Sequence, residues 1–467
     1  MNDTNPETTS APEATPSPVP ILRNAWSIAG AVITTIAAVM FIGFFFLDIF
    51  GFHTNPYLGI VFFVFFPALF VFGLLLIPIG GWIERRTRLK GAPSMPAWPR
   101  IDLNSATVRK VAFAILILTP LNVLIVSAAG YKAIEVSDSV AFCGATCHEV
   151  MQPEYAAYQH GPHARVKCVD CHIGPGADWF VQAKISGTRQ VFAVLTGSHS
   201  RPIQSPVHNL RPASGTCQQC HWPAKFHGDK IETVYDYADD EANTESVTSL
   251  RLRIGGLDGA GRPQGIHWHV AEENAIEYVS LDEKRQNIAW IQQTTPNGIV
   301  EYRAEGVTDD QIAKGQRRRM DCIDCHNRPS HIFERSVERG VNKVIATGGA
   351  PKDLPFLKRE AVAALKAEYT SHEDASAKIE SALTTFYQKQ YPETWTSRKA
   401  DIARTVASLQ ALYKRNVFPS MKLTWGYHAD NRGHMEFPGC FRCHDDLHKS
   451  KDGKVIRQDC ELCHEVL

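Results

Sequence analysis

The sequence predicts a mainly α-helical protein with three membrane-spanning helices near its amino terminus and a small inserted β module. Three observations predict this arrangement. Three long runs without a charged residue lie within the first 130 residues. Six cysteine pairs, each followed directly by a histidine, recur from residue 143 to the end of the chain. A block of short alternating segments without cysteine separates the third pair from the fourth.

The uncharged runs are Ala25–Leu47, Tyr57–Gly80 and Val111–Gly130. Each is close to the roughly 20 residues that a helix needs to cross a bilayer core. The first run begins too late and is too long for the apolar part of a cleavable signal peptide, so we expect it to be retained. Residues 1–20 are rich in Pro, Thr, Ser and Glu, which predicts a disordered tail before a three-helix membrane anchor over residues 21–131.

Charge in the loops predicts the orientation of the anchor. The segment Trp82–Lys110 carries seven Lys or Arg residues, whereas Asp48–Pro56 carries none. By the positive-inside rule the basic loop is cytoplasmic. The amino terminus is then inside, and everything after Gly130 is outside.

The cysteine pairs have the pattern that attaches c-type haem. In C-x-x-C-H the two thiols add to the porphyrin vinyl groups and the histidine binds the iron. Zinc and thiol redox sites also use C-x-x-C, but they do not require a histidine after every pair. The first pair has one extra residue, and a local disulfide remains its alternative. The attachment residues are Cys143, Cys147, Cys168, Cys171, Cys217, Cys220, Cys322, Cys325, Cys440, Cys443, Cys460 and Cys463, with His148, His172, His221, His326, His444 and His464.

Six covalently bound c-type haems make the predicted fold class a mainly α multihaem cytochrome with three N-terminal transmembrane helices and a small inserted β module. Because c-type haem is attached outside the cytoplasm, the motifs and the loop charges agree. Both indicate a multi-pass protein of the bacterial inner (cytoplasmic) membrane with its haem domains in the periplasm. Lys plus Arg and Asp plus Glu number 49 each, so nothing suggests nucleic acid. Haem propionates would make the holoprotein negative, which leaves a cationic redox partner at least as plausible as an anionic one.

Beyond the anchor we expect three domains: a haem domain over residues 132–230, a β module over 231–316, and a helical haem domain over 317–467. Each haem domain would hold three motifs. The expected strands are Ser249–Ile254, Ile266–Val270, Ala275–Val279, Ile288–Gln293 and Ile299–Arg303. The expected helices are Lys358–Tyr369, Glu373–Gln390 and Arg398–Tyr413.

The 19 histidines are more than the motifs need, so we expect most irons to have a second histidine ligand and to be low-spin. A histidine on the surface or bonded to a propionate is the alternative for each candidate. His267 and His269 flank Trp268 at strand spacing, which would point both to one face, and they are reserve candidates. The preferred set, each within ten residues of a motif, is His163, His208, His331, His434 and His448.

A membrane helix that leads into C-x(2,3)-C-H-E-x-M, a tyrosine-rich step, a histidine before C-x-D-C-H, and then Trp and Lys resembles the NapC/NirT group of membrane-anchored multihaem quinol dehydrogenases. The resemblance covers roughly residues 111–225. This chain has a longer form, with extra membrane helices and added distal haem motifs. In this form it is similar to the inner-membrane quinol-oxidising cytochromes of metal-reducing bacteria. The matching residues are Cys143, Cys147, His148, Glu149, Met151, Tyr155, Tyr158, His163, Cys168, Asp170, Cys171, His172, Trp179 and Lys184.

The resemblance implies that Met151 or His148 ligates the first iron and that His163 ligates a more distant haem. We also expect quinol to be oxidised beside the first haem, because the third predicted helix ends near Gly130, only thirteen residues before Cys143, and tethers this haem close to the bilayer surface. Lys184 and Asp178 lie in the region that the family uses, and Gln190 could supply a polar contact. A lysine that reaches toward lipid headgroups is the alternative for Lys184.

The expected function is oxidation of menaquinol or ubiquinol from the quinol pool and transfer of electrons to a periplasmic redox protein or reductase. On this hypothesis the chain is a quinol dehydrogenase in contact with membrane lipid. The alternatives are a terminal reductase of a small oxyanion or nitrogen compound and a non-enzymatic haem-wire subunit of a larger membrane complex.

Overall fold

The computed structural model describes residues 24–49, 61–88, 103–146, 148–174, 176–206, 211–222, 228–271, 273–295 and 298–467. The chain divides into two units, residues 1–142 and residues 143–467. We call them the membrane unit and the motif unit. The predicted disordered tail, residues 1–20, lies outside the described residues.

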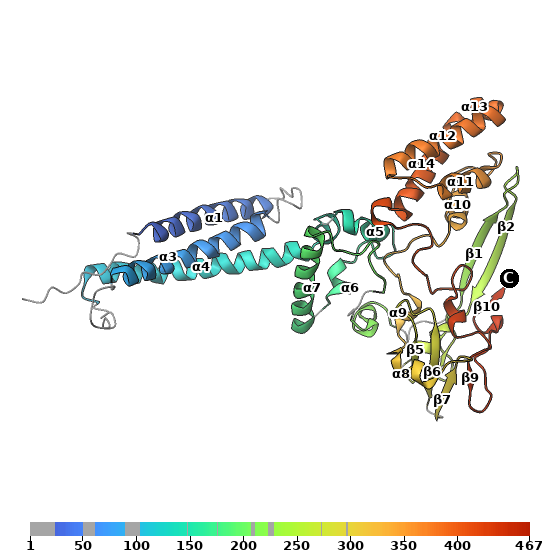
Figure 1. The fold of residues 1–467 in the computed structure, drawn as a ribbon, viewed down its shortest axis with the longest axis horizontal. Helices are drawn as coiled ribbons and strands as arrows, with labels where there is room; N and C mark the ends of the chain where they lie inside the picture. The colour runs from blue at the N-terminus through green and yellow to red at the C-terminus, as the bar shows by residue number, and fades with distance from the viewer. Residues whose placement is uncertain are drawn as a thin grey trace, which may run out of the picture. The chain divides into compact units, whose positions relative to one another are not determined.

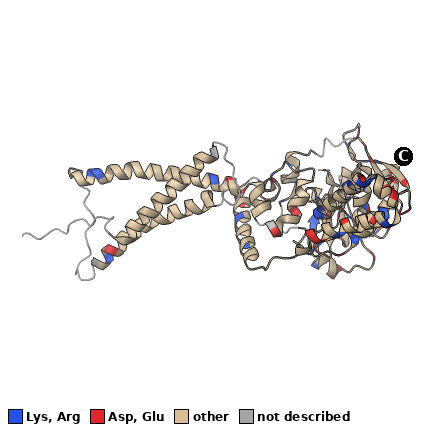
Figure 2. Cartoon of the chain, turned by 90° about the horizontal axis from the view of Figure 1, so that it is seen from above, with Lys and Arg blue, Asp and Glu red and all other residues tan. Residues whose placement is uncertain are grey.

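Long apolar helices make up the membrane unit, as the uncharged runs predicted. Their apolar spans have mean hydropathies of 2.3, 2.6 and 2.4, and each is long enough to cross a membrane. Charged residues are sparse along them (Figure 2). A π-helical turn, Val61–Phe65, precedes the second helix. The helices are α1 (Ala25–Ile49), α3 (Phe66–Arg88) and α4 (Ala106–Ser137) (Figure 1).

Small residues let α1 and α3 approach closely. A Cβ atom added to Gly30 would lie 2.7 Å from the carbonyl oxygen of Gly73, and one added to Gly73 would lie 2.9 Å from the carbonyl oxygen of Gly30. Ser27 Oγ donates a hydrogen bond to the carbonyl of Ile77 at 2.8 Å. Close backbone approach and interhelical hydrogen bonds stabilise helix pairs in lipid, where burial of apolar surface gives no driving force.

Short helical turns carry the cysteine motifs of the motif unit. The second motif is α6 (Cys168–His172), between α5 (His148–Gln159) and α7 (Ala177–Leu195). The fourth motif begins in α9 (Cys322–Cys325). The third, fifth and sixth motifs lie on the 3₁₀ turns Cys217–Gln219, Gly439–Arg442 and Cys460–Leu462.

The predicted β structure is present as antiparallel sheets. The larger sheet has the strand order β8-β5-β6-β7-β9, and a smaller one has the order β1-β2-β10. Both sheets include a strand from the last twenty residues of the chain. Helix α8 (Asp309–Lys314) precedes β8. The strands are β1 (Lys230–Tyr237), β2 (Glu245–Leu252), β3 (Gly256–Leu257), β4 (Pro263–Gln264), β5 (Ala275–Ser280), β6 (Ile288–Thr295), β7 (Gly298–Arg303), β8 (Gln316–Arg319), β9 (Lys449–Ser450) and β10 (His464–Val466).

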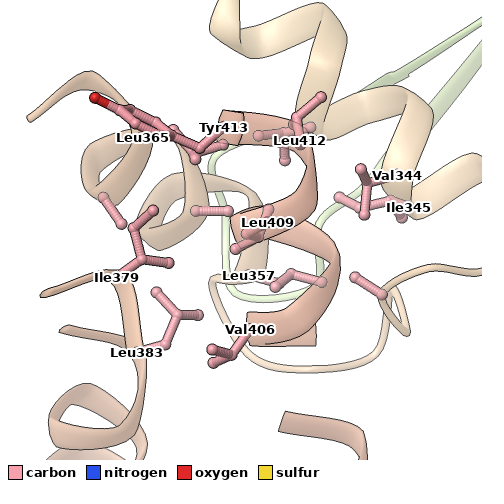
Figure 3. Close-up of a cluster of buried hydrophobic side chains, with 14 of the residues drawn as sticks. Val344, Ile345, Leu357, Leu365, Ile379, Leu383, Val406, Leu409, Leu412 and Tyr413 are labelled. Carbon is pink, nitrogen blue, oxygen red and sulfur yellow. The ribbon is translucent and has the colours of Figure 1, made fainter. Parts of the chain in front are cut away.

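A helical cluster between the fourth and fifth motifs holds the largest apolar core of the motif unit (Figure 3). Leu357, Ile379 and Leu409 in this core are at most 1% exposed. The three helices predicted here are confirmed. Helix α10 was not predicted, although Ser336 caps its first turn by accepting a hydrogen bond from the Arg339 amide. The helices are α10 (Val337–Ala346), α11 (Leu357–Lys366), α12 (His372–Gln390), α13 (Pro392–Ser397) and α14 (Lys399–Asn416).

Replacing Leu409 by Ala should lower the free energy of unfolding of this cluster by about 3 kcal/mol, because the cavity left in a close-packed core cannot fully collapse. Denaturant unfolding followed by circular dichroism measures this. Gln388→Ala, on the exposed face of α12, is the control and should change stability by no more than about 0.5 kcal/mol. Equal effects of the two substitutions would contradict the packing described here.

Candidate haem-binding sites

Each C-x-x-C-H motif folds into one tight turn. In the third, fourth and fifth motifs the backbone N–H of the histidine donates to the carbonyl of the first cysteine at 2.8, 2.8 and 3.0 Å. Residues three and four apart lie on one face of such a turn. The two thiols and the imidazole therefore emerge on the same side, as covalent attachment of one porphyrin requires.

The first motif accommodates its extra residue in a π-helical turn, Phe142–Thr146. A π turn closes one residue later than an α turn, so an inserted residue is absorbed without unwinding the helix. Gly144 is buried, and a Cβ atom there would lie 2.3 Å from the ring of Tyr155. Cys147 and the side chain of His148 lie outside the described residues. Met151 lies three residues after His148 on α5, on the same helix face.

Five of the motif histidines face a second histidine. Metal–imidazole bonds are about 2 Å long, so an iron between two imidazoles puts the ring centroids roughly 6 Å apart. The observed separations match this spacing. They are 6.2 Å for His172 and His331, 6.1 Å for His221 and His163, 6.4 Å for His326 and His267, 5.8 Å for His444 and His269, and 6.1 Å for His464 and His434.

Backbone carbonyls orient five of these ten imidazole rings. A carbonyl can only accept, so each bonded Nδ1 carries the proton and Nε2 is left to bind a metal, an arrangement typical of metal-binding histidines. The Nδ1 to oxygen distances are 3.1 Å for His163 to Pro329, 3.0 Å for His331 to Glu154, 3.1 Å for His267 to Ile254, 2.8 Å for His269 to Ile266 and 2.9 Å for His444 to Arg457.

The structure corrects the prediction for His448. This side chain is 2% exposed and both ring nitrogens are in use. Nδ1 lies 2.9 Å from Asp445 Oδ1, and Nε2 lies 3.0 Å from the carbonyl oxygen of Ile288. No nitrogen is left for iron, so His448 joins β6 to the loop after the fifth motif. His208 lies outside the described residues.

The expected strand Ile266–Val270 was also wrong, because the segment is a 3₁₀ helix. Gly265 precedes it with φ of +65°, which turns the chain out of an extended path. With three residues per turn, residues two apart point in different directions. His267 therefore faces His326, and His269 faces His444. The sequence signal for these two ligand candidates was the His-Trp-His triplet. The prediction assumed the spacing of a strand and therefore placed both histidines on one face.

Neighbouring motifs meet through their cysteines in chain order. Sulfur atoms of the first and second motifs, and of the third and fourth, are within hydrogen-bonding contact. Thiols of the other successive motifs are close enough for their charges to interact. The six attachment sites thus form one continuous series. Cys143 contacts Cys168 and Cys217 contacts Cys322, whereas the pairs within electrostatic range are Cys171 with Cys220, Cys325 with Cys440, and Cys440 with Cys463.

A cavity of about 260 Å³ lies at the fifth motif. Its walls include His269 and His444, and Ile276, Ile291 and Tyr302 of the five-stranded sheet. A porphyrin has two apolar faces and needs apolar walls around the paired histidines. The residues of this cavity fit that requirement, so the β module supplies one side of a haem site.

Asp324, inside the fourth motif, ties that motif to β5. Its carboxylate is 1% exposed and accepts a hydrogen bond from the Tyr278 hydroxyl at 2.6 Å. Burial, together with the charge of Asp324, raises the pKa of Tyr278, so the hydroxyl keeps its proton. Arg285 and Arg318 each place a guanidinium nitrogen 3.5 Å from the same carboxylate. This network compensates the buried charge and fixes the turn.

The three predicted quinol-site residues share helix α7 but do not converge. Asp178, Lys184 and Gln190 are spaced six residues apart, which rotates each by about 240° and raises it about 9 Å from the last. Asp178 and Gln190 are exposed, whereas Lys184 is half-buried with Nζ 4.9 Å from the centroid of the Phe180 ring. Helix α7 alone cannot bring the three groups to one ligand.

Three apolar helices followed by a series of C-x-x-C-H turns and paired histidines define a membrane-anchored multihaem c-type cytochrome. Residues 105–221 match the family described as NapC/NirT cytochrome c family, N-terminal region. The chain is 42% identical over 450 residues to the cytochrome c-type protein ImcH of Geobacter sulfurreducens, which covers 96% of this chain and 88% of that protein. It is 31% identical over 78 residues to the cytochrome c-type protein NrfH of Wolinella succinogenes, covering 16% of this chain and 44% of that protein.

The chain therefore belongs to the NapC/NirT cytochrome c family. The predicted resemblance, the fold class and the three membrane helices are confirmed. It is an inner-membrane electron-transport protein with covalently bound haem c and a periplasmic haem domain. No solved structure matches the chain.

Gly144→Ala should prevent haem attachment at the first motif, because the added methyl group would collide with the Tyr155 ring. Haem content per chain, measured as the pyridine haemochrome, should fall by one. The double variant Gly144→Ala with Tyr155→Ala should recover it, since the smaller partner makes room. Gly187→Ala, where no atom lies within 4 Å of the added Cβ, should keep the full content. Normal haem content in Gly144→Ala would disprove the packing constraint.

Proposed function

We propose that this chain carries six haems, oxidises menaquinol or ubiquinol beside the first of them, and delivers the electrons to a periplasmic redox protein or reductase. The observation that carries the proposal is the pairing of five motif histidines with a second histidine at the spacing of a doubly ligated iron. When bound, a haem iron with two imidazole ligands accepts and releases one electron at a time and has no open position for a substrate.

The ligand pairs that we propose join distant parts of the chain. His163, His331 and His434 serve the third, second and sixth motifs, and His267 and His269 serve the fourth and fifth. His148 or Met151 serves the first motif, which has no second histidine against it among the described residues. Each pair locks two segments together, so the attachment sites keep fixed separations along the series.

The five pairs weigh against the terminal-reductase alternative. A reductase would need an iron with an open position late in the series, where electrons arrive. Against this, a second histidine ring lies about 6 Å from the motif histidine at each of the last five motifs, which supports a doubly ligated iron there. The first motif, which differs, follows α4 by only a few residues, because α4 ends at Ser137 and the motif begins at Cys143. This position supports electron entry at the first site.

Lys184 is the residue that we propose for proton handling at the quinol site. A quinol releases two protons with its two electrons, so an ionisable group must lie within hydrogen-bond reach of its hydroxyl. Lys184 is half-buried, and Val181 and Ile185 beside it are 54% and 67% exposed. Exposed apolar side chains around a half-buried amine suit an apolar ring with a polar hydroxyl. Asp178 and Gln190 point away from Lys184 along α7. They would contact the same quinol only if another part of the chain, or the quinol itself, bridged the distance along the helix.

His269→Ala should convert one low-spin haem to high-spin, because the fifth iron would lose an imidazole. Electronic absorption and electron paramagnetic resonance spectra of the oxidised protein measure this change. His448→Gln is the control: its ring bonds only to protein groups, so the variant should stay fully low-spin. A high-spin signal in His448→Gln with none in His269→Ala would reverse the assignment.

Lys184→Leu should slow haem reduction by a quinol analogue at least tenfold in the purified full chain, while reduction by dithionite and the haem content stay unchanged. Arg189→Leu, an exposed cation on a different face of α7, should keep the parental rate. Equal slowing in both variants would point to a general charge effect. A parental protein that quinol cannot reduce without another subunit would instead support the haem-wire alternative.

A further inference from the structure

A buried ion pair lies directly against one of the paired histidines. Glu154 of α5 is 13% exposed and Arg328 is 10% exposed. Arg328 Nη2 donates to both carboxylate oxygens of Glu154, at 3.1 and 2.8 Å. Arg328 lies two residues after the fourth motif, so the pair joins the helix of the first motif to a distant segment.

Both partners also hold His331. The ring Nδ1 lies 3.0 Å from the backbone carbonyl oxygen of Glu154 and 3.3 Å from its carboxylate Oε2. Arg328 Nε donates to the backbone carbonyl of His331 at 2.8 Å. Among the paired histidines in the described part of the chain, His331 alone has a carboxylate in ion-pairing contact with its ring.

Stability does not explain this arrangement. Desolvating two charges costs several kcal/mol per ion, and apolar side chains of similar size often stabilise a fold as well or better. The Arg328 guanidinium, which donates to both carboxylate oxygens of Glu154, compensates the negative charge of that side chain. The carboxylate is therefore an anion beside Nδ1–H. A carboxylate partner makes an imidazole a more basic ligand.

We propose that Glu154 is a positioning residue that lowers the reduction potential of the haem bound between His172 and His331. This inference rests on the proposed ligand pair. The negative charge at Nδ1 strengthens donation from Nε2 and favours the oxidised iron, while Arg328 keeps the carboxylate oriented. The second site adjoins the entry site, and Glu154 lies on the helix that follows the first motif. One helix thus serves both sites.

The test is a spectroelectrochemical titration of the full chain in detergent with a chemical reductant, so quinol plays no part. Glu154→Gln keeps the size and the backbone carbonyl but removes the charge. One of the midpoint potentials should rise by about 59 mV, a tenfold change in the one-electron equilibrium. The g-values of one low-spin haem should change with it. Glu154→Asp keeps the charge and should recover part of the shift.

Glu149→Gln is the matched control, because Glu149 is exposed on the same helix, and it should leave every potential unchanged. Unchanged potentials in Glu154→Gln with full haem content, or an equal shift in Glu149→Gln, would overturn the inference. If Glu154→Gln binds fewer haems, Glu154→Asp decides: because it keeps the charge, a rise of about 59 mV in one of its potentials, as large as the rise expected for loss of the charge, would be contrary to the proposal. His331→Ala tests the ligand pair separately. A high-spin haem in His331→Ala together with unchanged potentials in Glu154→Gln would support the ligand pair and contradict only the proposed role of Glu154.

Discussion

Opposed imidazoles about 6 Å apart are the interaction on which the motif unit depends. A C-x-x-C-H turn supplies only one of the two rings, and the other comes from a different segment in every described pair. An iron bound between them would cross-link the chain at each site. The motif turns are short and carry few apolar residues, so the proposed cross-links, together with the porphyrin faces, would take the place of a protein core around them.

The largest apolar core of the motif unit lies where no cysteine motif is present. The helical cluster α10–α14 packs Leu357, Ile379 and Leu409 out of solvent. The five-stranded sheet supplies the apolar wall of the fifth site and, through Tyr278, a hydrogen bond to Asp324 in the fourth motif. These elements hold the paired histidines at fixed positions.

Charge is compensated locally at the sites. Asp324 in the fourth motif faces Arg285 and Arg318, and Glu154 beside His331 faces Arg328. A buried carboxylate without such a partner would be protonated instead of charged. Pairing with arginine offsets the desolvation cost of each of these buried carboxylates. The neutral overall composition gives no sign of this arrangement, because it depends on where each charge is buried.

The sequence by itself determined the three membrane helices, the six attachment turns and the class of protein. These features are local: an apolar run must be helical in lipid, and two cysteines and a histidine need only one turn. It also predicted His163, His331 and His434, which lie close to a motif in the chain. Only the tertiary structure decided which ring faces which. His448 lies near a motif yet bonds to Asp445 and Ile288, whereas His267 and His269 diverge on a 3₁₀ helix to face different motifs. Such pairings join segments far apart in the sequence, and spacing along the chain carries no information about contacts that folding alone creates.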